Sequence, residues 1–200
     1  MHQHGKQAAR ALRMFGVGLG IFIAAGISLC LVASSFKHHA PTLVFASTID
    51  PNCQVIIDAN NKFLTTPYHA YSTLSGAFTG GPPMNIEMIF VDGTLYTQAN
   101  GQWSDKRLTE QDVKDMETSN RNTNEKASCQ HVRNESVNGE STAVYSSHSE
   151  NERGKSDLVS WISKSKGLIL RLDLDVVTPK GAKGHMSTRY EYSNIQKPKL

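Results

Sequence analysis

The segment that decides the fold is Trp161-Ile-Ser-Lys-Ser-Lys-Gly-Leu-Ile-Leu-Arg-Leu-Asp-Leu-Asp-Val176. A period of two runs through its second half, and this period is typical of a β-strand, whose successive side chains point to opposite faces. One predicted face is apolar and consists of Leu168, Leu170, Leu172, Leu174 and Val176. The other face holds Ile169, Arg171, Asp173 and Asp175. The leucine face must be covered by a helix, a second sheet or a bound apolar ligand.

Hairpin signals surround this strand. Asp92-Gly93, Asn100-Gly101 and Asn138-Gly139 each stand between alternating segments. Such pairs favour two-residue hairpin turns, because both turn residues take a positive φ. Further strands are predicted at 67–79, 86–91, 94–98, 102–106, 129–137, 140–148, 158–163 and 185–192. Successive short connections indicate an antiparallel meander.

Two helices are predicted beside these strands. Asp50 and Pro51 are typical of an N-cap and a first helical position, and the helix should end near residue 64, before Pro67. A second, short helix should begin after Thr109, which forms a capping box with Asp112. The polar residues 119–126 are expected to lie beyond it. The chain is therefore expected to be α+β, with a curved antiparallel sheet of about eight or nine strands around the N-terminal helix.

The N-terminus has the pattern of a membrane-targeting segment. A basic stretch that ends at Arg13 precedes 20 uncharged residues, Met14 to Ala33, and Val44-Phe45-Ala46 offers a cleavage site before Ser47. The apolar stretch is also long enough to span a bilayer as an uncleaved anchor. We therefore expect residues 1–46 to be a signal peptide or a membrane anchor with a linker, followed by one domain at 47–200 outside the cytoplasm.

Charge and cysteine content agree with export. Four of the 21 basic residues precede Ser47, so the remainder has 17 basic against 18 acidic residues. This balance argues against a nucleic-acid partner, which would need a basic patch in the folded part. Cys53 and Cys129 are the cysteines of that part, and in an oxidising compartment they most simply form a disulfide. The alternative is a pair of buried free thiols.

Signatures of catalysis and of metal binding are absent from the sequence. It has no Gly-x-Ser-x-Gly, no His-Glu-x-x-His and no phosphate-binding glycine loop. Asp173 and Asp175 share the polar face of one strand, which is more typical of a solvated surface than of a catalytic pair. His69 lies among aromatic residues and is expected to be a packed histidine. We therefore expect no enzyme, no metal and no cofactor.

The order of these features resembles that of the exported LolA/LolB superfamily. The resemblance rests on the hairpin Asp92-Gly-Thr-Leu-Tyr96, on Trp103, and on the segment from Trp161 to Arg171, and it covers about Asp50 to Gln196. It implies a curved antiparallel half-barrel, closed by helices, with an apolar cavity for acyl chains. The superfamily comprises lipoprotein carriers and related lipid-binding periplasmic proteins, envelope-stress sensor domains, and a branch of small-molecule enzymes. The cysteine pair and a possible uncleaved anchor depart from the carrier pattern.

Two functions follow as hypotheses. The first is a periplasmic monomer that binds a lipid or an acylated lipoprotein on its apolar face, lined by Leu168, Leu170, Leu172, Leu174, Trp161, Ile162, Met88 and Phe90. The second is a membrane-anchored periplasmic interaction or sensor domain without ligand transport. A closed core, in which the helix from Asp50 fills the space over the leucines, is the structural alternative to a binding cavity.

Overall fold

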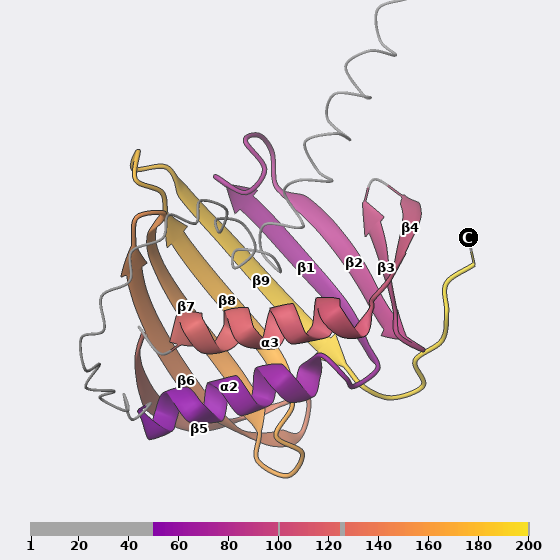
Figure 1. Ribbon diagram of the computed structural model, residues 1–200, viewed down its shortest axis with the longest axis horizontal. Coiled ribbons are helices and arrows are strands. Elements are labelled where there is room, and N and C mark those ends of the chain that lie inside the picture. Colours follow the sequence, from indigo (N-terminus) through magenta and orange to yellow (C-terminus); the bar gives the residue numbers. More distant parts are fainter. Residues whose placement is uncertain (1–49, 100, 125–126, 200) are drawn as a thin grey trace, which may run out of the picture.

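Nine antiparallel strands form one sheet, and two helices lie across one of its faces in the computed structural model (Figure 1). The structure describes residues 50–99, 101–124 and 127–199, so the targeting segment expected at 1–46 lies outside them. The expected α+β class is confirmed. The elements are α2 (Pro51–Phe63), β1 (Tyr68–Gly76), β2 (Met84–Val91), β3 (Thr94–Ala99), β4 (Gln102–Arg107), α3 (Glu110–Asn124), β5 (Ser128–Val137), β6 (Glu140–Asn151), β7 (Gly154–Ser163), β8 (Ile169–Val177) and β9 (Lys183–Glu191).

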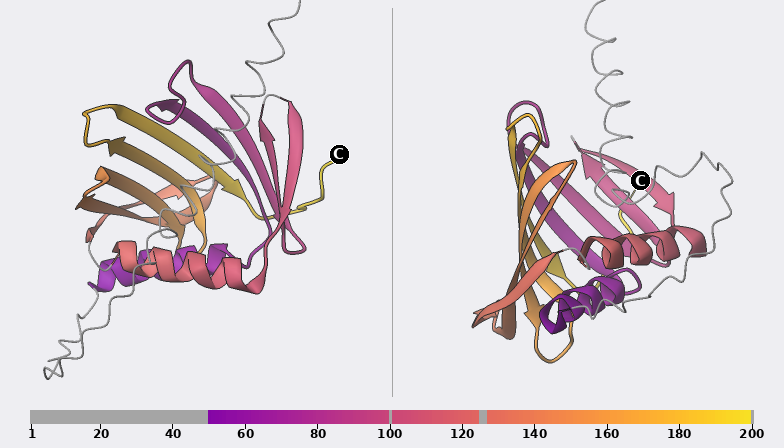
Figure 2. Two further views of the ribbon diagram at one scale, coloured as in Figure 1. Left: turned by 45° about the horizontal axis from the view of Figure 1, so that its top comes forward. Right: turned by 60° about the vertical axis from the view of Figure 1, so that its left-hand side comes forward.

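The sheet consists of two meanders joined by one long-range pairing. The strand order is β4-β3-β2-β1-β9-β8-β7-β6-β5, and all pairs are antiparallel. Two predicted hairpin turns are confirmed, since Asp92 and Gly93 have φ of 51° and 71°, and Asn138 and Gly139 have φ of 52° and 80°. The sheet curves around the side that bears the helices, and its strands extend beyond them (Figure 2).

A β-bulge changes the predicted phase of the leucine strand. Ile162 pairs with Ile169, whereas the preceding Trp161 pairs with Arg171, so Leu170 is left without a partner on β7. One extra residue in a strand reverses the faces to which the side chains before it point, relative to those after it. Ile169 therefore packs in the same cluster as Leu172, and the prediction of five apolar side chains on one face from Leu168 to Val176 is wrong at its first two positions.

Helix α2 covers one end of the curved face. Asp50 caps it as predicted, with its carboxylate accepting a hydrogen bond of 2.7 Å from the backbone N–H of Asn52. Its buried stripe is Cys53, Ile56, Ile57 and Ala59. Three of these residues pack with strand residues in one cluster: Cys53, Ile56 and Ala59 with Cys129, Ile162 and Ile169. The N-terminal helix therefore fills part of the sheet's inner side, as the sequence predicts.

Helix α3 lies against α2 and is longer than predicted. The capping box forms, because the backbone N–H of Asp112 donates to Thr109 Oγ1 at 3.1 Å while the backbone N–H of Thr109 donates to the Asp112 carboxylate at 2.8 Å. The helix continues to Asn124 through residues expected to lie beyond it. A helix needs only one buried stripe. Helix α3 places Met116 in that stripe and exposes Glu110, Gln111, Lys114, Thr118 and Arg121. Neither described helix has the length and apolar content needed to span a membrane.

Candidate functional site

The two faces of the sheet differ sharply in charge. Cross-strand partners in an antiparallel sheet point to the same face, so the register assigns each strand residue to the inner face, which bears the helices, or to the outer face. In the described strands the inner face carries two basic or titratable nitrogen side chains, Lys106 and His131, on the edge strands β4 and β5. The strand carboxylates all belong to the outer face: Glu87, Asp105, Glu135, Glu140, Glu150, Asp157, Asp173, Asp175 and Glu191.

A continuous apolar row crosses the inner face beyond the helices. It consists of five direct cross-strand neighbours on β2, β1, β9, β8 and β7, here called the Met–Leu row: Met84, Leu74, Met186, Leu174 and Leu158. At the usual strand spacing, four intervals span roughly 19 Å. Leu74 is buried, but the other four side chains are only half-buried. The row is therefore an apolar surface that remains partly accessible.

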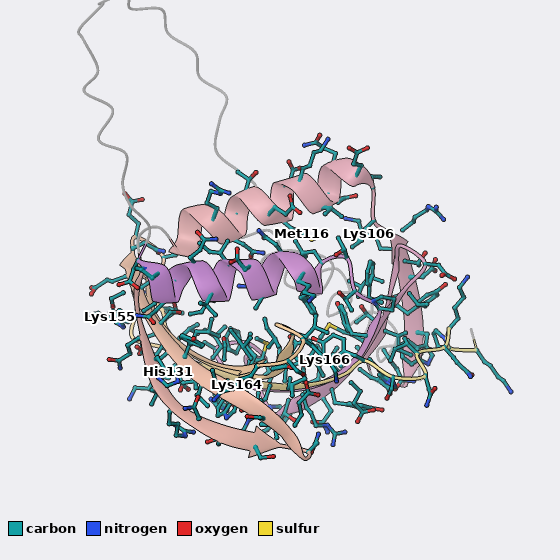
Figure 3. The ribbon with its side chains drawn as sticks, turned by 90° about the horizontal axis from the view of Figure 1, so that it is seen from below. Lys106, Met116, His131, Lys155, Lys164 and Lys166 are labelled. Carbon is teal, nitrogen blue, oxygen red and sulfur yellow. A yellow bond between two sulfur atoms is a disulfide. The ribbon has the colours of Figure 1, made fainter. Side chains whose placement is uncertain are left out.

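The end of the inner face beneath the helices is a closed core. Phe63 of α2 stacks on Tyr68, with ring centroids 4.3 Å apart, and meets Tyr190 edge-on at 5.1 Å. Burial raises the pKa of the Tyr68 phenol far above its usual range, and the neighbouring Tyr190 adds to this. Burial also raises the pKa of Tyr192, whose hydroxyl donates to the backbone oxygen of Ile169 at 2.6 Å. These phenols stay neutral and so add no charge to this core. Figure 3 shows side chains filling the space between the helices and the curved sheet.

The structure brings together five of the eight predicted lining residues. Ile162, Leu172, Leu174, Met88 and Phe90 share the inner face. Ile162, Leu172, Met88 and Phe90 pack in or against the clusters at the helix-covered end, which leaves Leu174 in the accessible row.

The other three predicted residues do not join this face. Trp161 points to the outer face, as partner of Arg171, while Leu168 and Leu170 are buried at the bulged junction of β7 and β8. Sequence reasoning missed Leu74, Met84, Leu158 and Met186. Apolar and polar residues alternate along their strands, which indicates one apolar face for each strand. No local feature of the sequence predicts that these apolar faces are neighbours in the sheet.

Trp161 belongs to a cation–π cluster on the outer face. The guanidinium of Arg171 lies 4.5 Å from its ring centroid and that of Arg133 lies 5.9 Å away. The indole Nε1 donates to the Glu135 carboxylate, and the hydrogen bond from Arg133, followed by the one from Trp161, lowers the pKa of Glu135. Trp161 is buried by these charged neighbours, so its role is to hold β5, β7 and β8 together rather than to line an apolar site.

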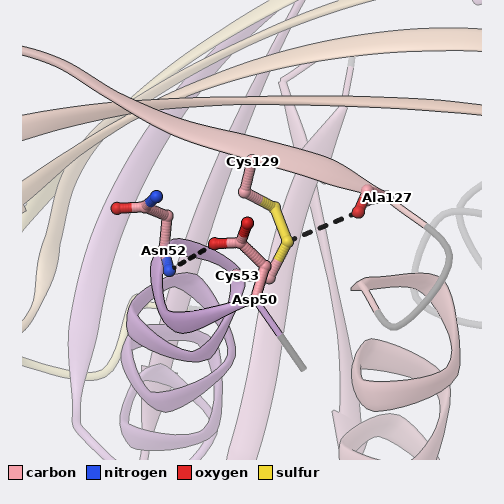
Figure 4. The surroundings of a disulfide bond; sticks show 5 residues. All are labelled: Asp50, Asn52, Cys53, Ala127 and Cys129. Carbon is pink, nitrogen blue, oxygen red and sulfur yellow. Dashed lines mark hydrogen bonds between the residues drawn. A yellow bond between two sulfur atoms is a disulfide. The ribbon is translucent and has the colours of Figure 1, made fainter. Parts of the chain in front are cut away.

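The predicted cysteine pair forms a disulfide between α2 and β5. Cys53 and Cys129 have Cα atoms 5.2 Å apart and are 76 positions apart in sequence. Figure 4 shows the bond beside the capped N-terminus of α2, with Cys53 Sγ lying 3.6 Å from the backbone oxygen of Ala127. This last approach is a packing contact, because a disulfide sulfur has no proton to donate. The crosslink attaches the covering helix to the sheet.

The outer face contains the arrangement closest to a catalytic one. His69 Nε2 lies 2.6 Å from Glu87 Oε1, and the Tyr71 hydroxyl lies 3.4 Å from His69 Nδ1. Burial, followed by the charges of Glu191 and Glu87, raises the pKa of Tyr71, which opposes formation of a nucleophilic phenolate. His69 stacks on Tyr71 with centroids 4.4 Å apart, as expected of a packed histidine. Within the described residues, no three His, Cys, Asp or Glu side chains gather as metal ligands.

No protein-family model matches the sequence, and no curated protein matches it. Some solved structures show a weak likeness to this protein. The Mycobacterium tuberculosis lipoprotein LppX is 9% identical, with a TM-score of 0.44 over 72% of this chain and 96% of LppX. The Pseudomonas aeruginosa MucA/MucB complex contains a chain that is 10% identical, with a TM-score of 0.47 over 73% of this chain. The protein spans 58% of that chain.

A LolA superfamily protein from Nitrosomonas europaea is 11% identical, with a TM-score of 0.23 over 74% of this chain and 94% of its own length. At such identities and TM-scores, these likenesses bring neither a ligand nor a partner to this protein. The fold is the one that the sequence resemblance implies: an unclosed, curved antiparallel sheet with two helices on its inner face.

Proposed function

We propose that the inner face binds a lipid or the acyl chains of a lipoprotein, by contact and without catalysis. The single observation that carries the proposal is the Met–Leu row, which is apolar on five neighbouring strands yet half-buried on four of them. Monomeric proteins seldom leave contiguous apolar surface partly exposed unless it binds something. All the carboxylates of the described strands lie on the opposite face. An acyl chain on the Met–Leu row therefore desolvates no strand carboxylate.

The composition of the row suits ligands of variable shape. Methionine side chains are unbranched and polarizable, so Met84 and Met186 adapt to different chain positions. Burying ten methylenes contributes roughly 8 kcal/mol, while association costs about 4 kcal/mol or more. A single acyl chain along the row would therefore bind measurably without any polar contact.

The site of action that we propose is the periplasm or the cell envelope. The disulfide between Cys53 and Cys129 supports this location, since such crosslinks persist in oxidising compartments. The uncharged stretch from Met14 to Ala33 supplies a route of export.

A paired substitution on β8 tests the function. Leu174→Glu places a carboxylate on the inner face between Leu158 and Met186. The matched control, Val177→Glu, places the same group on the outer face of the same strand, between Lys155 and Lys183. Uptake of the apolar fluorophore N-phenyl-1-naphthylamine should weaken at least about tenfold in Leu174→Glu, because an unpaired carboxylate opposes apolar burial. Val177→Glu should bind like the unaltered protein.

Two results would contradict the proposal. One is equal fluorophore binding by Leu174→Glu and the unaltered protein, with circular dichroism showing both folded. The other is the absence of both co-purifying lipid, by mass spectrometry of organic extracts, and fluorophore uptake by the unaltered protein.

A further inference from the structure

A hydroxyl-rich area continues the Met–Leu row on the inner face of β6 and β7. Leu158, at the end of the row, pairs directly with Ser147. Ser147 is one of four serines in this area, here called the serine patch: Ser147, Ser149, Ser156 and Ser160. On the inner face, the apolar Met–Leu row is therefore followed by hydroxyls on β7 and β6.

Ser160 is the unusual member of this patch. Its side chain is 1% exposed, and its Oγ has no hydrogen-bond partner among the described residues. Leaving a buried hydroxyl unpaired costs free energy, so such groups in native proteins usually have a partner or a function. The register points Ser160 to the inner face, between Tyr145 and Leu172.

Its neighbours show that burial alone does not prevent pairing. Ser149 and Ser156 bond to each other through their hydroxyls at 2.7 Å, and on neighbouring strands Ser72 and Thr188 do the same at 2.7 Å. Serine hydroxyls on this face thus pair where a partner is within reach. Tyr145 and Leu172, which flank Ser160, are half-buried and pack against the core cluster beneath α2. A ligand group would therefore reach the Ser160 hydroxyl only when these two side chains rotate away from it.

We infer that the inner face holds an uncharged amphiphile in one orientation, with its acyl tail along the Met–Leu row and a carbonyl-bearing head over the serine patch. The inference rests on the proposed function and adds the orientation of the ligand and the uncharged nature of its head. Ser160 donates its hydroxyl proton to an ester or amide carbonyl of the head, and Ser147 lies beside it. A charged head finds no counter-ion on the inner face of β6 or β7, and the nearest basic side chain there is His131 on the edge strand β5.

Competition binding tests this orientation. The full-length chain is kept in solution by amphipol, loaded with N-phenyl-1-naphthylamine, and titrated with monolauroylglycerol, laurate or lauroyl-lysophosphatidylcholine. Monolauroylglycerol, with an uncharged ester head, should displace the fluorophore at concentrations about tenfold lower than laurate, since an unpaired charge is costly to bury. Lysophosphatidylcholine should also be weaker, because its zwitterionic head carries both a phosphate and an ammonium charge.

Two alanine variants locate the head. Ser160→Ala should weaken displacement by monolauroylglycerol about tenfold, the scale of one lost hydrogen bond. The same variant should leave the affinity for the headless fluorophore and for laurate unchanged. Ser146→Ala removes a hydroxyl from the outer face of β6 and should change none of these affinities.

The outcomes distinguish a failure of this inference from a failure of the proposed function. If the fluorophore binds but laurate displaces it as well as monolauroylglycerol does, the inferred preference for an uncharged head is wrong. If Ser160→Ala keeps full preference for monolauroylglycerol, the Ser160 contact is overturned, while apolar binding stands. If the unaltered protein takes up no fluorophore, the proposed function fails first and the inference fails with it.

Discussion

Removal of the disulfide should destabilise the protein by an amount set by the length of the loop that it closes. The double variant Cys53→Ser/Cys129→Ser avoids a leftover free thiol. In the chain-entropy description, a crosslink between residues 76 positions apart stabilises the folded state by roughly 4 kcal/mol, because it restricts the unfolded chain. We therefore expect the free energy of unfolding to fall by about 3–5 kcal/mol.

Urea titration followed by far-ultraviolet circular dichroism measures this loss. The native spectrum should remain unchanged without urea, because Ile56, Ile57 and Ala59 stay buried against neighbouring residues. The dependence of the free energy on urea should steepen, since the uncrosslinked chain exposes more surface on unfolding. Dithiothreitol should reproduce the same loss in the unaltered protein. Cys30→Ser, which keeps both disulfide partners, is the matched control.

Two results would refute this reasoning. A loss below about 1 kcal/mol in the double variant would mean that loop closure does not govern the contribution of the crosslink. In the Cys30→Ser background, two free thiols per denatured, unreduced chain would mean that the bond does not form at all.

Three further stability predictions follow from individual contacts. Ser160→Ala should raise the free energy of unfolding by about 1 kcal/mol, because it removes an unpaired buried hydroxyl, whereas Thr188→Ala should lower it by about 1 kcal/mol; urea midpoints compare the two. Asp112 has its pKa lowered to about 2 by hydrogen bonds from its capping partner, so the carboxylate stabilises the fold above about pH 4 and loses this effect as the pH falls through about 2. Asp112→Asn should accordingly cost about 0.5–1 kcal/mol at pH 7 and clearly less at pH 2, where part of the effect is lost, by thermal melts at both values. Arg171→Ala should cost about 1 kcal/mol and shift Trp161 emission to longer wavelength, since it uncovers the indole; an unshifted spectrum argues against the stacked arrangement.

Local chemistry in the sequence determined the elements and their ends. Turn residues such as Asp92-Gly93 require backbone angles that few other residues adopt, and the capping residues Asp50 and Thr109 pair with backbone groups only two or three positions away. These interactions are complete within a short segment, so they are visible without the fold. The cysteine pair was predictable for another reason, because two cysteines in an exported domain leave one simple pairing.

The candidate site was decided by tertiary structure. Its row depends on the pairing of β1 with β9, which sets Leu74 beside Met186, and nothing near either residue specifies that contact. The face of each leucine in β8 depends on the bulge at Leu170, because a shift of one residue moves every side chain before it to the other face. Ser160 looks like any other strand serine in the sequence. Only the packed sheet buries its hydroxyl without a partner, because burial is a property of the neighbours that the fold supplies.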